Sequence, residues 1–485
     1  MSARIPSAAT LRAWCAFILL LGAGCSSSAK NSGDGGGAAG DGDGTAADAS
    51  GGTLSWSAAV RIDNDHGFTA SAPRMAVSSD GSIMAVWLQS EDDNSSPLTS
   101  RVYASLYTTV GWQAPVLLNP DIASHGPAYA PKIVADGRGS FFAVWSQAST
   151  AAEGARIGVY GKRYLPEAGW EAAVTTIDAE QVDAGMSATG ALDIAADASG
   201  NATVVWTMSD ETWAHMVIEA ARYTSGTGWA SGQIVTNEDA QSISGPAVAM
   251  DVAGNAMVVW GQATGASIAV QGVHAATYTV GSGWETPVVI EPVGISETHS
   301  GLAPQVVFDG QGDAVVVWCH HGLPGIYANR WSGVTGWGAA TAIAGTSPTS
   351  ADEGVQLAVD KQGNAIALWN QHNGSLLASR CAAGGDWGPT QLVDPGNADD
   401  SGRIAIGPDV TARAVWVQHV GTQSNIWANR YVPERGWGSS SREDSIIGEV
   451  SNNASDPQVV IDQSGTATVL WSQDKGLYAT HITSH

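Results

Sequence analysis

Tryptophan recurs along this chain at two positions of a long repeat, and this spacing limits the possible folds more than any other feature. Sixteen of the 20 tryptophans belong to one of two sets, and neighbours in the first set are 47 to 61 residues apart. The first set ends an apolar run: Trp87, Trp145, Trp206, Trp260, Trp318, Trp369, Trp416 and Trp471. The second usually follows a glycine: Trp56, Trp112, Trp170, Trp229, Trp284, Trp337, Trp387 and Trp437.

The stretch Pro304–Trp337 shows one repeat most clearly. An apolar run, a tight turn, a second run, a loop, a third run and a Gly-Trp pair indicate four antiparallel strands. A period near 50 residues with strand patterning is typical of propeller blades, whereas helical arrays have shorter periods and 3.6-residue patterning. We therefore predict an all-β fold, an eight-bladed β-propeller of four-stranded antiparallel blades over residues 54–485.

The two ends of this region are complementary halves of one repeat. Leu54–Ile62 contains only the part around Trp56, and Asp456–His481 contains every part except that one. We expect the N-terminal strand to complete the last blade, which closes the ring and removes exposed sheet edges.

Several polar residues recur at fixed distances from the first tryptophan set. A glycine lies six residues before the tryptophan in seven units, a glutamine often lies two residues after it, and the third run often ends in arginine. Recurrence from blade to blade favours a structural role for these residues, with Asp and Gly forming the turn. The seventh unit has Gly407 and Val410 at the turn positions, which predicts a different turn there. The recurring aspartates are Asp136, Asp197, Asp251, Asp309, Asp360 and Asp462.

The N-terminus has the features of an export signal. Arg4 and Arg12 precede an apolar run, Ala13–Ala23, that is too short to span a bilayer as a helix. The run ends in LGAGC, which resembles a bacterial lipoprotein signal; the alternative is ordinary secretion. The resemblance implies a signal peptide over 1–24, lipid on Cys25 and a location at the outer membrane, on its periplasmic face or the cell surface. Residues 25–53 are rich in Gly, Ser and Asp, which predicts a flexible linker.

Charge and cysteine content narrow the possible partners. The formal net charge is −25, which disfavours binding to nucleic acid and to anionic headgroups, so we expect membrane attachment through the Cys25 lipid alone. Beyond Cys15 and Cys25, the chain has only Cys319 and Cys381, either free or paired with each other. We expect a monomer.

The chain has no motif that predicts a cofactor, a metal or a catalytic group. It lacks a phosphate-binding loop, a metalloprotease helix motif, a GxSxG elbow and a pair of CxxC motifs. Off-pattern histidines follow the tryptophan in three consecutive repeats: His321, with His320 beside it, His372 and His419. They form a shared metal site, a rim that contacts a ligand, or an ordinary polar edge; neighbouring blades lie too far apart to favour the metal. Trp213 and His215 either stack on a sugar or cover the blade.

Two kinds of connection should share one face of the propeller: those between second and third strands, and those between blades. Variable polar loops on a constant scaffold are where specificity usually lies. The chain resembles sialidase-like and kelch-like propellers in shape, but no family motif matches in full. We therefore expect a non-enzymatic lipoprotein that binds glycan or protein, or acts as a scaffold, through this acidic face; the alternatives are a carbohydrate-active hydrolase or lyase and an envelope assembly scaffold. The acids between blades are Asp63, Asp65, Asp121, Asp178, Glu180, Asp183, Glu238, Asp239, Glu297, Asp352, Asp399 and Asp400.

Overall fold

The structure is a computed structural model whose contacts divide the chain into two compact units, Met1–Ser55 with Ser484–His485, and Trp56–Thr483. In the first unit, β1 (Ala46–Ala47) pairs antiparallel with β2 (Thr53–Trp56). The predicted signal peptide and Cys25 lie outside the described residues. These are 46–47, 53–64, 68–90, 100–120, 125–149, 156–178, 187–210, 212, 215–236, 240, 242–263, 271–291, 301–320, 325–344, 352–371, 374–396, 398–399, 402–438, 441–442 and 453–484.

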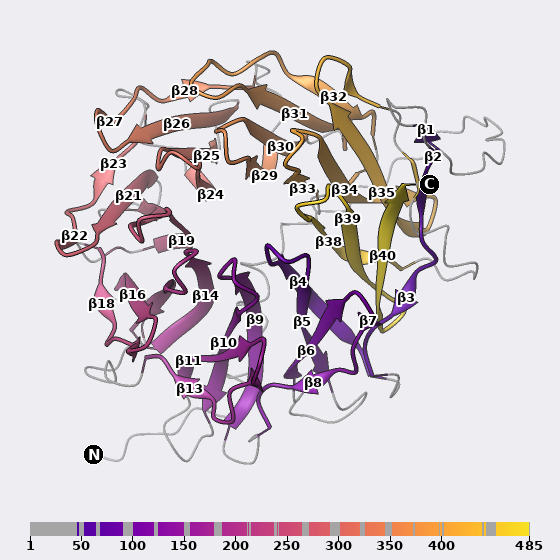
Figure 1. The fold of residues 1–485 in the computed structure, drawn as a ribbon. Coiled ribbons are helices and arrows are strands. Elements are labelled where there is room, and N and C mark those ends of the chain that lie inside the picture. Colours follow the sequence, from indigo (N-terminus) through magenta and orange to yellow (C-terminus); the bar gives the residue numbers. More distant parts are fainter. Residues whose placement is uncertain are drawn as a thin grey trace. The chain divides into compact units, whose positions relative to one another are not determined.

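The second unit is an eight-bladed β-propeller, as predicted, and each blade is an antiparallel sheet (Figure 1). Innermost strands of successive blades contact one another around the whole ring, and the last of them contacts the first. The described residues contain strands and turns but no helix, and so no helix long and apolar enough to cross a membrane.

Each blade is built from three long strands and a short outer edge. The innermost strands of blades 1 to 8 are β4 (Ala70–Val77), β9 (His125–Ala135), β14 (Ser187–Ala196), β19 (Ser242–Met250), β24 (Gly301–Phe308), β29 (Asp352–Val359), β33 (Arg403–Ile406) and β38 (Ser455–Ile461). The second strands are β5 (Ile83–Ser90), β10 (Phe141–Ser149), β15 (Ala202–Ser209), β20 (Ala256–Ala263), β25 (Ala314–His320), β30 (Ala365–Gln371), β34 (Ala412–Val420) and β39 (Ala467–Gln473). The third strands are β6 (Ser100–Thr108), β11 (Ile157–Leu165), β16 (Met216–Thr224), β21 (Gln271–Thr279), β26 (Ile326–Ser332), β31 (Leu376–Cys381), β35 (Gln423–Val432) and β40 (Gly476–Ser484). The outer strands are β7 (Gly111–Trp112) and β8 (Val116–Leu117), β12 (Gly169–Trp170) and β13 (Thr175–Thr176), β17 (Gly228–Trp229) and β18 (Gln233–Ile234), β22 (Gly283–Trp284) and β23 (Val288–Val289), β27 (Gly336–Trp337) and β28 (Thr341–Ala342), β32 (Gln391–Asp394), β36 (Gly436–Trp437) and β37 (Ser441–Arg442), and β3 (Val60–Arg61).

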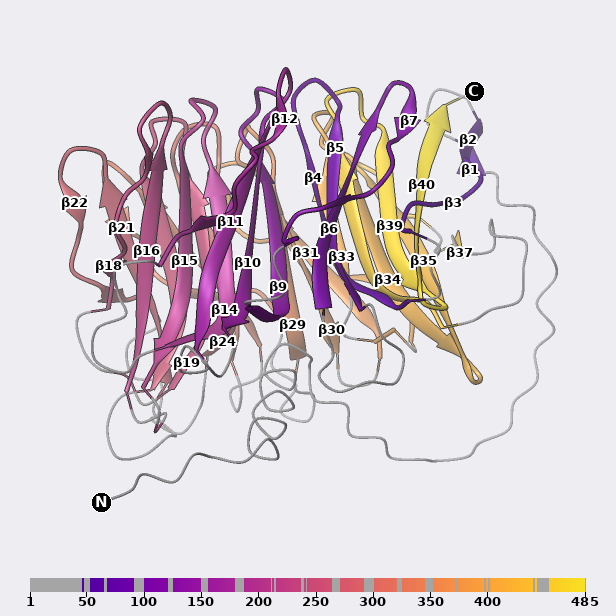
Figure 2. The same ribbon diagram turned by 90° about the horizontal axis from the view of Figure 1, so that it is seen from below.

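The strands run between two faces of the ring (Figure 2). Because neighbouring strands are antiparallel, turns between first and second strands lie at one end, which we call the turn face. Connections between second and third strands, such as Asp474–Lys475, lie at the other end, which we call the loop face.

The second strands are mostly apolar because both of their faces are covered by neighbouring blades. All eight tryptophans of the first set are fully buried, with 0% exposure. Trp145 of blade 2, for example, packs against Met84, Val86 and Val102 of blade 1. Burying an indole removes ~150 to 250 Å² from water, so these residues contribute strongly to the core between blades.

The predicted ring closure is confirmed within the second unit. Val60 and Arg61 of β3 pair with Ala479 and Tyr478 of β40. Next to this pair, Ser57 donates its N–H to His481 O at 2.8 Å. Blade 8 is therefore made from both ends of the repeat region.

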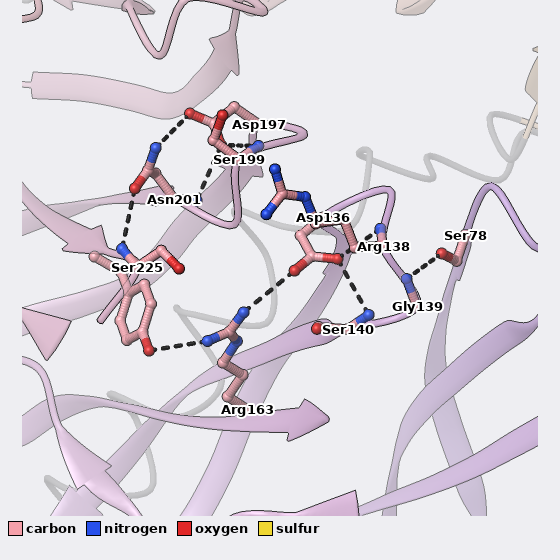
Figure 3. Close-up of polar contacts among 11 residues, drawn as sticks. Ser78, Asp136, Arg138, Gly139, Ser140, Arg163, Asp197, Ser199, Asn201 and Ser225 are labelled. Carbon is pink, nitrogen blue, oxygen red and sulfur yellow. Dashed lines mark hydrogen bonds and ion pairs between the residues drawn. The ribbon is translucent and has the colours of Figure 1, made fainter. Parts of the chain in front are cut away.

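The recurring turn aspartates are structural, as predicted (Figure 3). Asp136 Oδ1 accepts the N–H groups of Arg138 and Ser140 at 2.9 and 3.1 Å, while Arg163 Nη2 donates to Asp136 Oδ2 at 3.2 Å. The same guanidinium donates to Tyr223 Oη of blade 3 at 3.0 Å, so the network also joins blades. The two N–H groups of the turn are bound in the same way by Asp197, Asp251, Asp309, Asp360 and Asp462.

Five of the recurring glutamines accept a hydrogen bond from the indole N–H of a buried tryptophan. Trp145 Nε1 donates to Gln147 Oε1 at 3.0 Å, and Gln147 Nε2 donates to Gly126 O at 3.1 Å, which connects the indole to the start of β9. The indole is also paired with glutamine in Trp87–Gln89, Trp260–Gln262, Trp416–Gln418 and Trp471–Gln473.

The prediction of a different turn in blade 7 is wrong. Gly407 N–H bonds to Thr411 O at 2.7 Å and Val410 N–H to Gly407 O at 3.1 Å, the same pattern as the other turns. Val410 adopts a φ of 64°, the conformation that glycine supplies elsewhere. The turn is kept at the expense of backbone strain in a β-branched residue.

Candidate functional site

Most of the side chains predicted to form the histidine rim lie outside the described part of the chain. His321, His372 and Trp213 lie outside the described residues, and of His320 only the backbone, at the end of β25, is described. His419 and His215 are described, and both are exposed on the loop face. Within the described ranges, no three His, Cys, Asp or Glu side chains group so as to hold a metal ion.

His419 lies between a hydroxyl and a carboxylate. Its Nδ1 is 3.0 Å from Ser424 Oγ, and its Nε2 is 3.8 Å from Asp399 Oδ2. The His419 side chain is 53% exposed, so water competes for both contacts. This arrangement fits a polar edge that water or a ligand contacts better than an activated nucleophile, which needs a tightly held base.

His215 lies in the connection between the second and third strands of blade 3. Its carbonyl oxygen accepts the N–H of Asp210 at 3.1 Å. The carboxylate of Asp210 in turn accepts the N–H of Thr212 at 3.0 Å. The predicted pairing of His215 with Trp213 falls partly outside the described residues.

A pocket of about 500 Å³ opens on the loop face where blade 8 meets blade 1. We call it the seam pocket, because it lies beside the closure of the ring. Hydroxyl, amide, carboxylate and amine groups line it. The lining residues are Thr69, Ala70, Ser71, Asn453, Ser455, Ser472, Gln473, Asp474 and Lys475.

One wall of the seam pocket is a tight hairpin with unusual backbone geometry. Asp474 and Lys475 connect β39 to β40 and have φ values of 45° and 70°. Two positive φ values are typical of the two-residue hairpin turn whose twist matches the strands. Lys475 O accepts the N–H of Ala70 at 2.9 Å, and Asn453 Nδ2 lies 3.4 Å from Asp474 Oδ1. Contacts from blade 1 and from the segment before β38 therefore hold the hairpin in place.

The lining also includes Ser472, whose Oγ is buried and makes no hydrogen bond within the described part of the chain. A buried hydroxyl without a partner loses the hydrogen bonds that water would supply.

Sequence reasoning did not identify these residues, because they are ordinary serines, an asparagine and a turn. The available signal was the ring closure itself, since blade 8, which borders blade 1, is the blade whose repeat is divided between the two ends of the region.

Some acids that were expected on the functional face are instead structural. Asp63 is buried, accepts Arg61 Nε–H at 2.8 Å and accepts the N–H of Leu477 at 3.0 Å. Burial raises the pKa of Asp178, against hydrogen bonds from the backbone that lower it. Asp399 is partly exposed beside His419. The side chains of the other acids named above are outside the described residues.

The two cysteines whose pairing was left open, Cys319 and Cys381, are both buried and do not form a disulfide with each other. Arg330 Nη2 lies 3.1 Å from Cys381 Sγ. These thiols lie within the blades, away from the seam pocket residues.

No protein-family model and no curated protein sequence matches the chain. Among solved structures, it is similar to the BP39L lectin from Burkholderia pseudomallei, with 13% identity, a TM-score of 0.49, and coverage of 76% of this chain and 99% of the lectin. It is similar to polysaccharide lyase Uly1 with 11% identity, a TM-score of 0.44, and coverage of 73% and 89%. The intramolecular trans-sialidase from Ruminococcus gnavus gives 10% identity, a TM-score of 0.34, and coverage of 85% and 94%. At such low identities and TM-scores, no property of these proteins transfers to this chain.

Proposed function

We propose that this protein is a non-enzymatic binding propeller that takes a carbohydrate in the seam pocket. The observation that carries the proposal is the lining of that pocket by Ser and Thr hydroxyls, Asn453, Gln473, Asp474 and Lys475. Sugar hydroxyls are both donors and acceptors, and these side chains include both kinds of group.

Binding without turnover fits this lining better than hydrolysis. Glycoside hydrolysis ordinarily uses two carboxyl groups, about 5 to 9.5 Å apart, on either side of the scissile bond. Asp474 is the single carboxylate in the lining of the seam pocket. A single carboxylate next to an amine and amides can orient sugar hydroxyls, but it does not provide the acid and base pair.

The test is a glycan array probed with the purified full chain, followed by titration of the best glycan. We expect Asp474→Asn to weaken binding at least tenfold, because it removes the charge but keeps the shape. Thr422→Ala is the matched control, since Thr422 is exposed at the tip of the equivalent hairpin of blade 7 and is not part of the lining. Glycan binding that Asp474→Asn leaves intact, or release of reducing sugar from the bound glycan, would contradict the proposal.

We further propose that the protein is attached to the outer membrane of a bacterium by lipid on Cys25. The support is the sequence LGAGC after an apolar run, followed by a Gly- and Asp-rich stretch. The test is incorporation of labelled palmitate into the full chain and into Cys25→Ser. Equal labelling of the two proteins, or none in either, would refute lipidation.

A further inference from the structure

One position of the repeat lines the centre of the ring and is strongly polar. It is the residue of the innermost strand that pairs with the residue preceding the buried tryptophan. The eight equivalent residues, in ring order, are Arg74, Lys132, Asp193, Ala247, Gln305, Gln356, Arg403 and Gln458. We call them the channel ring.

A repeated distortion of the innermost strands precedes this position. In seven of the eight blades, the pairing of the first two strands is shifted just before the channel-ring residue, as in a β-bulge. Ala72, Ala130 and Ala303 lie in these bulges with φ near 50°, each followed by proline. Bulges change the direction of the side chains that follow them. The same strained conformation in several blades indicates that the direction of the channel-ring side chains has a function.

The channel-ring side chains fold back on their own strand in a common way. Arg74 Nη1 donates to Pro73 O at 2.7 Å, and Arg403 Nη1 donates to Gly402 O at 2.9 Å. Gln458 Nε2 donates to Pro457 O at 2.8 Å. All of the polar channel-ring residues are partly exposed although their strands are innermost.

Charge is distributed unevenly around the channel ring. On one side, Lys132 Nζ contacts Asp193 Oδ1 at 3.1 Å, and Asp193 Oδ2 accepts the N–H of Val248 at 3.1 Å, so this pair is neutral and satisfied. On the other side, Arg403, Gln458 and Arg74 are contributed by the consecutive blades 7, 8 and 1. The acidic chain thus gathers two guanidinium groups at one side of its axis.

The two arginines repel each other across blade 8. Burial, and next the charge of Arg74, lower the pKa of Arg403 to about 10, against Asp456 and Asp399, which raise it. Burial also lowers the pKa of Arg74, against Asp456 and Asp193. Both groups remain cationic at neutral pH. Burial makes their charged form less favourable, and a nearby anion would offset this free-energy cost.

We propose that Arg74, Gln458 and Arg403 form a binding site in the channel for one oxyanion, a carboxylate, phosphate or sulfate group. Guanidinium groups bind oxyanions through parallel N–H···O bonds, and two of them on either side of an amide donor can grip one such group. Asp456, at the bulge before Gln458, and Asp399 offset part of the positive charge of the two arginines. The site is independent of the seam pocket, although β4 and β38 contribute to both.

The test is titration calorimetry of the purified full chain with sulfate, phosphate and glucuronate at constant ionic strength, with glucose as the neutral control. We expect Arg74→Gln and Arg403→Gln each to weaken oxyanion binding at least tenfold. Arg403→Lys keeps the charge but loses the planar pair of N–H donors that a guanidinium presents. It should therefore bind oxyanions more weakly than the wild type and fold normally. The matched control is Arg138→Gln, which removes one exposed arginine from the turn face.

The outcomes separate the sources of the oxyanion and the two proposals. Binding of glucuronate but not of sulfate or phosphate identifies a sugar acid, and the reverse identifies an inorganic anion or a phosphate or sulfate ester; both support the site. Oxyanion binding that is equal in wild type, Arg74→Gln and Arg403→Gln would overturn it, as would no binding of any oxyanion. Asp474→Asn should leave oxyanion binding intact, so failure here is distinct from failure of the seam pocket.

Discussion

Replacing Glu219 by glutamine should stabilise the protein, and more so as the pH rises. Glu219 lies in β16 directly opposite Trp206, is 1% exposed, and neither carboxyl oxygen has a hydrogen-bond partner in the described part of the chain. A Cβ on Gly232 would overlap Glu219 Oε1, so glycine at that position makes room for the carboxyl group. Burial, and next the charge of Asp178, raise the pKa of Glu219 from 4.5 to about 7.

The raised pKa gives both the sign and the size of the effect. Between pH 4.5 and 7 the folded chain holds a proton that the unfolded chain has lost, so stability falls as the pH rises through this window. A change from 4.5 to about 7 corresponds to about 3.4 kcal/mol at 1.36 kcal/mol per pH unit. Discounting for water near the outer part of the blade leaves about 2 kcal/mol.

The assay is urea unfolding of wild type and Glu219→Gln at pH 4 and pH 8. We expect the variant to be about 2 kcal/mol more stable at pH 8, with little difference at pH 4. Glu285→Gln, which removes an exposed carboxylate, is the matched control and should stay within ~0.5 kcal/mol of wild type. A Glu219→Gln effect of the same size at both pH values would refute the reasoning.

Three further substitutions test how the blades are built, each measured by urea unfolding against wild type. Val410→Gly should stabilise the fold by about 1 kcal/mol, because it relieves a φ of 64°; a loss of stability would contradict the strain. Gln147→Met should cost about 2 to 4 kcal/mol by leaving Trp145 Nε1 and a carbonyl without partners, and a change under ~0.5 kcal/mol would show that the bonds contribute nothing. Gly363→Ala should cost at least ~2 kcal/mol, since φ is 90° there and the new Cβ would lie 2.7 Å from Asp309 Oδ2; unchanged stability would mean that the blades yield at this contact.

The architecture was predictable because the residues that build it repeat. Tryptophans at two positions marked every blade, and the incomplete repeats at Leu54–Ile62 and Asp456–His481 indicated the closure. The turn of blade 7 was misjudged, since side-chain preference was taken as decisive where the surrounding strands impose the conformation on Val410.

The candidate sites were not predictable in the same way, because their residues differ from blade to blade. The channel ring contains arginine, lysine, aspartate, glutamine and alanine at one structural position, so no single residue type marks that position in every blade. Its signal is instead the Ala-Pro pair before Arg74, Lys132 and Gln305, which in the structure forms the bulge. The seam pocket depends on two segments from opposite ends of the repeat region, and only closure brings them together.

Thr480 Oγ1 donates a hydrogen bond to Ser57 O, which lies 423 positions earlier in the chain. The ring can therefore close only after the last strand is present. Until the final strand has been made and released, the growing protein is an incomplete ring whose two ends have strands with unpaired edges. Pairing of segments so distant in the sequence is slow, and exposed strand edges can pair with other chains. We therefore expect closure of the ring to be a late step of folding, and conditions that delay it should lengthen the time during which nascent molecules associate with each other.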